Sequence, residues 1–160
     1  MMMPAPQPEH QWLLQLVGEW TSEMEASPGP DQPEQKFVAT ENVRAIGDLW
    51  VVCESQGGSP GGLMTSIMTL GYDPTRQRFV GSFIGSMMSH QWVYEGQLDA
   101  AKKVLTLDTL GPSFANQNEM VKYQDIIEIV SPTERTLTAR YQGADGQWQH
   151  LMEVRYRRKA

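Results

Sequence analysis

Three titratable side chains lie in otherwise apolar, alternating stretches of the chain: His90, Asp125 and His150. A carboxyl group in an apolar strand has a raised pKa and could act as a general base, and a neutral imidazole could bind a ligand or ligate haem iron. Each also has an ordinary structural interpretation, as a hydrogen-bonded histidine or a carboxylate paired at a barrel mouth. Since an unpaired polar group on a buried face costs about 1–3 kcal/mol, we expect them to satisfy one another or to contact a ligand.

Strand alternation places these three groups on faces that are rich in methionine and aromatic residues. Methionine is flexible and polarizable, so such a face suits a pocket for varied apolar ligands, although it also suits a loosely packed core. We expect the whole set to face inward and to contact a ligand. The predicted ligand-binding residues are Met64, Met68, Met88, His90, Trp92, Tyr123, Asp125, His150 and Met152.

Motifs for other chemistries are absent from the sequence. It has no Gly-rich loop that opens a helix, no histidine pair at metal-ligand spacing and no Gly-x-Ser-x-Gly. The single Cys53 excludes an internal disulfide and lies in an apolar run, where we expect it to be buried. We therefore predict no catalytic residue, no metal and no cofactor, with haem bound through His150 as the alternative.

Charge and hydropathy narrow the range of partners. The net charge of −6 argues against non-specific nucleic-acid binding, which needs a basic surface. No apolar run reaches the roughly 18 residues of a membrane span, and the first residues lack the features of a secretory signal. We expect a cytoplasmic protein whose partner is a small apolar molecule, with no nucleic-acid or membrane partner; homo-oligomerisation stays open.

One short helix and ten strands are predicted. The helix covers Pro8 to Val17, where Pro8 suits a first helical position. Ten antiparallel strands with short turns form a sandwich or a closed barrel, and closure removes exposed edges. We therefore expect one domain over residues 8–160, after a disordered segment 1–7 and with a proline-rich loop at 28–33. The predicted strands cover residues 18–27, 36–46, 49–56, 63–72, 79–87, 90–96, 103–110, 121–130, 137–142 and 148–158.

Gly18 and Trp20 stand where helical spacing changes to strand alternation. A residue without a Cβ allows a sharp turn there, and a large indole just inside the first strand would plug the closed end of a barrel. The first and last strands must meet if the barrel closes. We therefore expect a cation of the last strand, Arg155 or Arg157, to lie over the Trp20 ring.

Six segments spread along the chain carry a family resemblance: Leu16–Thr21, Pro28–Pro30, Ile46–Trp50, Thr69–Pro74, Gly96–Asp99 and Met152–Lys159. They resemble the bacterial domain of unknown function 1579 family, within the calycin superfamily of lipocalins and fatty-acid-binding proteins. The resemblance implies an all-β, antiparallel up-and-down barrel with one short N-terminal helix. It implies no activity, because the family has none assigned. The late-strand His150 also loosely resembles the histidine of nitrobindins, which are haem-bearing barrels.

The sequence thus indicates the fold of the protein more firmly than its function. The leading hypothesis is non-enzymatic binding of a small hydrophobic or aromatic ligand in a barrel cavity. The alternatives are an enzyme that uses the cavity histidines and aspartate, a haem-binding barrel, and a filled barrel that acts through its surface.

Overall fold

The computed structural model describes residues 3–26, 35–59, 62–114 and 116–160. A short helix, α1 (Pro8–Leu14), precedes ten strands. The predicted loop at 28–33 and the first two residues lie outside the described residues. The strands are β1 (Gly18–Ala26), β2 (Gln35–Ile46), β3 (Trp50–Ser59), β4 (Gly62–Asp73), β5 (Arg78–Gly85), β6 (Met88–Leu98), β7 (Val104–Pro112), β8 (Met120–Ser131), β9 (Glu134–Gln142) and β10 (Trp148–Arg158).

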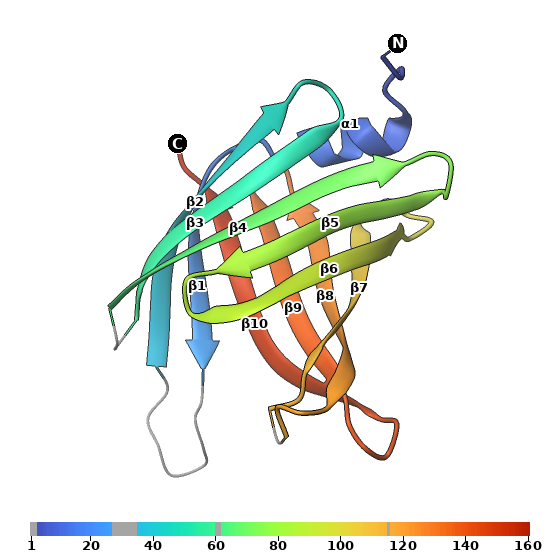
Figure 1. Ribbon diagram of the computed structural model, residues 1–160. Helices are drawn as coiled ribbons and strands as arrows, with labels where there is room; N and C mark the ends of the chain where they lie inside the picture. The colour runs from blue at the N-terminus through green and yellow to red at the C-terminus, as the bar shows by residue number, and fades with distance from the viewer. Residues whose placement is uncertain (1–2, 27–34, 60–61, 115) are drawn as a thin grey trace.

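The strands form one closed antiparallel barrel, as the sequence predicts. Each strand pairs with the next along the chain, and β10 pairs with β1 to complete the ring. Figure 1 shows α1 lying across one end of this barrel, which we call the helix end; the opposite end is the distal end. No helix among the described residues is long and apolar enough to cross a membrane.

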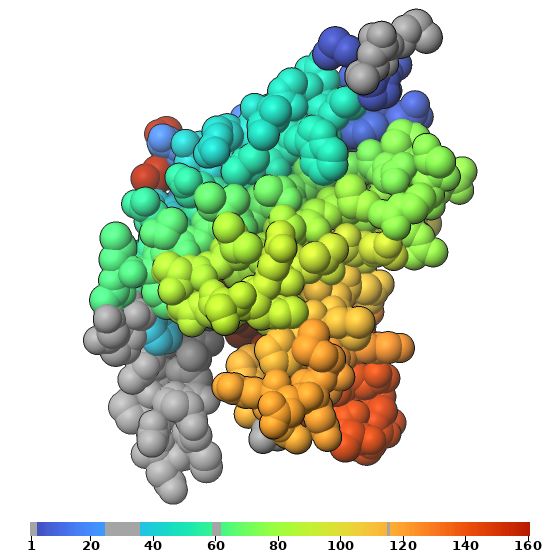
Figure 2. All heavy atoms as spheres, in the orientation of Figure 1, coloured from blue at the N-terminus to red at the C-terminus, as the bar shows by residue number. Residues whose placement is uncertain are grey.

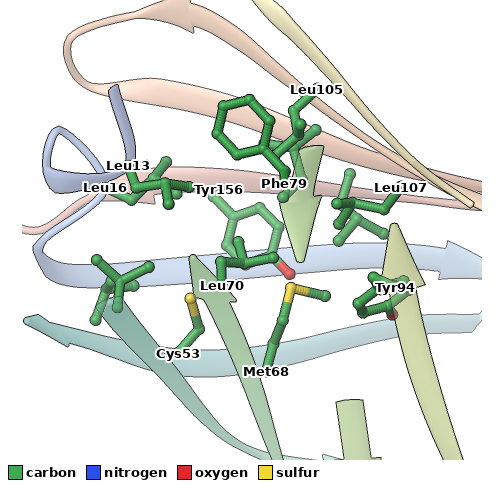
Figure 3. Close-up of a cluster of buried hydrophobic side chains, with 14 of the residues drawn as sticks. Leu13, Leu16, Cys53, Met68, Leu70, Phe79, Tyr94, Leu105, Leu107 and Tyr156 are labelled. Atoms are coloured by element: carbon green, nitrogen blue, oxygen red, sulfur yellow. The ribbon is translucent and has the colours of Figure 1, made fainter. Parts of the chain in front are cut away.

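The predicted helix is three residues too long. The N–H groups of Leu16 and Val17 bond to the carbonyls of Leu13 and Leu14, so the chain leaves α1 through tighter turns. Leu13 and Leu16 are each 1 % exposed and pack into the barrel among side chains of the neighbouring strands. Figure 3 shows both leucines beside this cluster, which includes Leu70 of β4.

Two polar side chains of α1 fix it to the strands beneath. His10 Nδ1 accepts the Gln7 N–H at 2.8 Å, so Nε2 carries the proton and donates to the Tyr72 carbonyl at 3.0 Å. The Trp12 indole N–H donates to the Lys102 carbonyl at 2.7 Å. These bonds attach a helix that is too short to be stable alone to β4 and to the turn between β6 and β7.

Trp20 is buried at the helix end, at 2 % exposure, which confirms its predicted position. Its indole N–H donates to the Leu16 carbonyl at 2.9 Å. The guanidinium carbon of Arg158 lies 4.3 Å from the ring centroid, and its two terminal nitrogens donate to the carbonyls of Val17 and Gln15. One side chain therefore joins the last strand to the first strand and to the end of the helix.

The prediction of Arg155 or Arg157 over this ring is wrong, although the strand is correct. Both point outward and are exposed, because alternation along β10 turns every second side chain outward; the residue opposite Trp20 is Arg158. Gly18 makes room for it. Its φ is +138°, and a Cβ there would collide with the Arg158 guanidinium.

A buried ion pair inside the barrel was not predicted. Arg135 of β9 bonds to Glu41 of β2 across the interior, and Ser55 Oγ donates to the second Glu41 oxygen at 2.8 Å. The Arg135 guanidinium carbon also lies 4.6 Å from the Trp20 ring centroid and 3.9 Å from that of Tyr156. Removing one partner leaves the other charge buried and uncompensated.

We predict that Glu41→Gln lowers the unfolding free energy by about 3 to 5 kcal/mol, because Arg135 loses its counter-charge. Urea denaturation monitored by tryptophan fluorescence measures this. Glu128→Gln on β8 makes the same change on an exposed side chain and should alter stability by less than about 0.5 kcal/mol. Equal effects of the two substitutions would contradict the account.

Candidate functional site

Inner-facing side chains become less buried from the helix end to the distal end. On β4, exposure rises from 0 % at Leu70 and 7 % at Met68 to the half-buried Ser66 and Met64. The interior is thus a packed core at one end and open at the other. We call the large apolar side chains that line the open end the distal lining. It comprises Met24, Phe37, Met64, Phe83, Trp92 and Met152, all half-buried and all inward by strand register.

A hydrogen-bonded polar pair lies at the base of the distal lining. The hydroxyl of Tyr94 on β6 donates to Oδ2 of Asp125 on β8 at 2.5 Å. Burial raises the pKa of Asp125, and the Tyr94 hydrogen bond offsets part of that shift. Burial and then the Asp125 carboxylate raise the pKa of Tyr94, so its hydroxyl keeps its proton and stays the donor.

The ladder between β6 and β7 is incomplete toward the distal end. Only Glu95–Leu98 pair with Leu105–Asp108, and the earlier part of β6 pairs with β5 alone. Side chains bridge the remainder: His90 Nε2 donates to the Leu110 carbonyl at 2.9 Å, and the Trp92 ring lies against Gly111, where a Cβ would collide with it. Figure 2 shows the surface hollowed between the yellow-green β5–β6 hairpin and the orange β7–β8 region.

Aromatic rings continue inward from this seam. The Trp92 ring meets His90 edge-on at 4.7 Å and Tyr123 edge-on at 4.9 Å between centroids. The Trp92 indole N–H donates to Met88 Sδ at 2.9 Å, and the Tyr123 hydroxyl donates to the Pro112 carbonyl at 2.5 Å. These contacts hold an aromatic wall beside the Tyr94–Asp125 pair.

Register places most of the predicted ligand residues on the inner face, although contact with a ligand stays a prediction. The aromatic wall unites four of them, and Asp125 lies at its base. The residues of the predicted set that register places inward are Met64, Met68, Met88, Trp92, Tyr123, Asp125 and Met152. His90 lies in the irregular part of the β5–β6 pairing, and its ring contacts that of the inward-facing Trp92.

His150 is the exception, and its predicted inward orientation is wrong. The register between β9 and β10 shifts between His150 and Met152, so Leu151 forms a β-bulge. A bulge inserts one residue and reverses the facing of all that precede it. His150 is exposed on the outer face opposite Arg140. A haem ligand inside the barrel needs an inward nitrogen, so His150 does not fit that role.

Cys53 is buried inside the barrel at 4 % exposure. Burial, followed by the nearby Glu41 carboxylate, raises the pKa of the Cys53 thiol to about 12, so it is not a nucleophile at neutral pH. Within the described ranges, no group of three or more His, Cys, Asp or Glu side chains could hold a metal ion.

The interior position of Tyr94 was predicted, but its role was not, and Arg135 was missed altogether. Tyr94 shares the predicted inward face of His90 and Trp92, but its role as partner of Asp125 depends on two strands that are distant in sequence. Arg135 lies outside the predicted strand 137–142, because β9 begins at Glu134. Extending the alternation of this predicted strand by two residues toward the N-terminus would have placed Arg135 on the inner face.

A pocket lies at the helix end of the barrel, beneath α1. Its volume is about 570 Å³, and its walls come from α1, from the ends of β4 and β5 with their turn, and from the β6–β7 turn region. None of the predicted ligand residues lines it.

Comparison with known proteins gives a family but no activity. The family model described as "Protein of unknown function (DUF1579)" matches residues 5–158, so the chain belongs to this family. This confirms the resemblance seen in the sequence. No curated protein is significantly similar in sequence.

The chain is also similar to proteins of known structure. The crystal structure of Rv2717c from M. tuberculosis aligns with a TM-score of 0.65 at 12 % identity, over 98 % of this chain and 100 % of that one. The redesigned barrel EF1p2_mFAP2b bound to DFHBI aligns with a TM-score of 0.49 at 17 % identity, over 94 % and 98 %. The first similarity establishes a shared fold, and the second is too distant to support an argument.

We predict that Asp125 titrates at a higher pH than Asp99 in a single carboxyl ¹³C NMR titration. Burial raises the pKa of Asp125, whereas backbone N–H groups of Val104 and Lys103 lower that of Asp99. The contribution of protonated Asp125 to stability is complete below about pH 3.9 and is lost as pH rises through its folded-state pKa. In urea denaturation, the unfolding free energy of Asp125→Asn should lack this decrease with rising pH. If Asp125 titrates at a lower pH than Asp99, the observed geometry is contradicted.

Proposed function

We propose that this member of the DUF1579 family binds a small apolar or aromatic molecule at the distal end of its barrel. The observation that carries the proposal is the distal lining, in which large apolar side chains face the interior without being fully buried. Binding of a ligand that removed about 200 Å² of apolar surface from water would be favoured by roughly 5 kcal/mol of hydrophobic free energy. The loss of the ligand's translational freedom offsets part of this gain.

Polar groups at the base of the lining would orient the ligand. Asp125 engages Tyr94 through Oδ2. The buried hydroxyl of Thr109, two residues along β7 from the partner of Asp125, has no hydrogen-bond partner among the described residues. Buried polar atoms in proteins are normally satisfied. We therefore expect a ligand with an apolar body and one hydrogen-bonding group at the end that enters first.

The seam between β6 and β7 supports a route of access. Its backbone edges are held by the side chains of His90 and Trp92 rather than by ladder hydrogen bonds. Side chains change rotamer on a much shorter timescale than strands separate. A ligand could therefore pass without breaking the barrel.

We test the proposal with the neutral fluorescent probe 1-aminoanthracene, which has an aromatic body and one amino group. Ser66→Trp places an indole in the interior, where the neighbours Ser55 and Gly85 are small, and should weaken binding at least about tenfold. Thr65→Trp adds the same indole on the outer face and should leave affinity unchanged.

The outcomes separate a binding site from a filled barrel. Saturable enhancement that Ser66→Trp abolishes and Thr65→Trp preserves supports the proposal. Equal affinities for both variants, or no saturable enhancement with the wild type, contradict it. His150→Ala, on the exposed outer face, should bind as the wild type does.

A further inference from the structure

The pocket beneath α1 contains a carboxylate that the fold does not use. Glu9 lines the pocket, and its Oε2 is buried without a hydrogen-bond partner among the described residues. Glu9 lies in the first turn of α1, where negative charge is favourable to the helix dipole. A solvent-facing carboxylate would give the same benefit, so the dipole does not explain the buried oxygen.

Three other polar side chains of the lining, those of Asp99, Trp12 and Gln15, are already engaged in hydrogen bonds. Asp99 accepts the N–H groups of Lys103 and Val104, and the Trp12 indole N–H donates to the carbonyl of Lys102. The Lys102 side chain itself is exposed on the rim. The pocket therefore contains an available acceptor in Glu9 Oε2.

Aromatic rings of α1 and of the strands beneath it line the pocket. Tyr72 meets Phe79 edge-on at 5.0 Å between centroids, and Phe79 meets Trp12 at 6.0 Å. Glu9 and Tyr72 line the same pocket, and burial and then the Glu9 and Asp73 carboxylates raise the pKa of Tyr72. A carboxylate beside aromatic rings is a favourable setting for a cation.

We propose that the pocket beneath α1 is a second binding site, specific for a small organic cation with an aromatic or apolar body. The ammonium or guanidinium group would pair with Glu9, and the body would lie against Tyr72, Trp12 and Phe79. The volume of about 570 Å³ falls in the range of small-molecule sites. This site is separate from the distal lining and does not depend on the function proposed for it.

The experiment compares three indoles of similar shape: tryptamine, a cation; tryptophol, its neutral counterpart; and indole-3-propionate, an anion. The readout is the Trp12 indole N–H resonance in ¹H–¹⁵N NMR of the full chain. We expect tryptamine to shift this resonance saturably and to bind at least about tenfold more tightly than tryptophol, as for one charge-assisted hydrogen bond. Indole-3-propionate should not bind.

Two variants test the carboxylate itself. Glu9→Gln keeps the shape and removes the charge, so it should weaken tryptamine binding about tenfold and abolish the preference over tryptophol. Glu19→Gln makes the same change on an exposed residue of β1 and should have no effect. An unchanged ¹H–¹⁵N spectrum elsewhere in the barrel establishes that Glu9→Gln is folded.

Each remaining outcome overturns the proposal. Absence of a saturable shift with tryptamine excludes the site. Equal affinities for tryptamine and tryptophol, or retention of the preference in Glu9→Gln, exclude recognition of a cation by Glu9. Ser66→Trp should leave tryptamine binding intact, since Ser66 lies on the inner face of the barrel and does not line this pocket.

Discussion

The placement of a guanidinium over the Trp20 indole is the interaction on which the rest of the barrel depends. Arg158 lies over the ring and donates to the last carbonyls beyond α1, so the two ends of the chain and the helix meet at one point. A cation over a desolvated indole is worth about 2 kcal/mol or more. Arg135, held by Glu41, lies over the same ring from within the barrel. Gly18 has no Cβ and therefore leaves room for the Arg158 guanidinium.

This arrangement concentrates the packed core at one end. α1 inserts Leu13 and Leu16 among the strands, and burial is complete there. No helix among the described residues covers the distal end, so the alternating inner faces continue past the core and remain half-buried. A barrel of ten strands is wider than its own side chains can readily fill, which favours a space of this kind. The proposed site is thus a consequence of closing the barrel asymmetrically.

The sequence predicted the barrel and most of its inner face because hydrophobic alternation has a strict period of two. Trp92 and Asp125 lie on the inner face, as that period predicts. His150 does not, since the bulge at Leu151 reverses the facing and carries no hydrophobic signature. Glu41 and Arg135 were missed because an unpaired buried charge is costly, so charged residues are expected on the surface. Each is buried here because the other, from a strand distant in sequence, supplies its counter-charge. The pocket beneath α1 was not predicted, because its walls come from segments that are distant in sequence and meet only in the folded chain.

The location of a ligand inside the barrel can be measured through its methionine methyl groups. With ¹³C-methyl methionine and bound 1-aminoanthracene, intermolecular NOEs report which methyls touch the probe. The account predicts NOEs to Met64 and Met152, which face inward at the distal end, and none to Met87 and Met120, which are exposed. NOEs confined to Met87 or Met120, or none to any methyl of a saturated sample, would contradict binding at the distal lining.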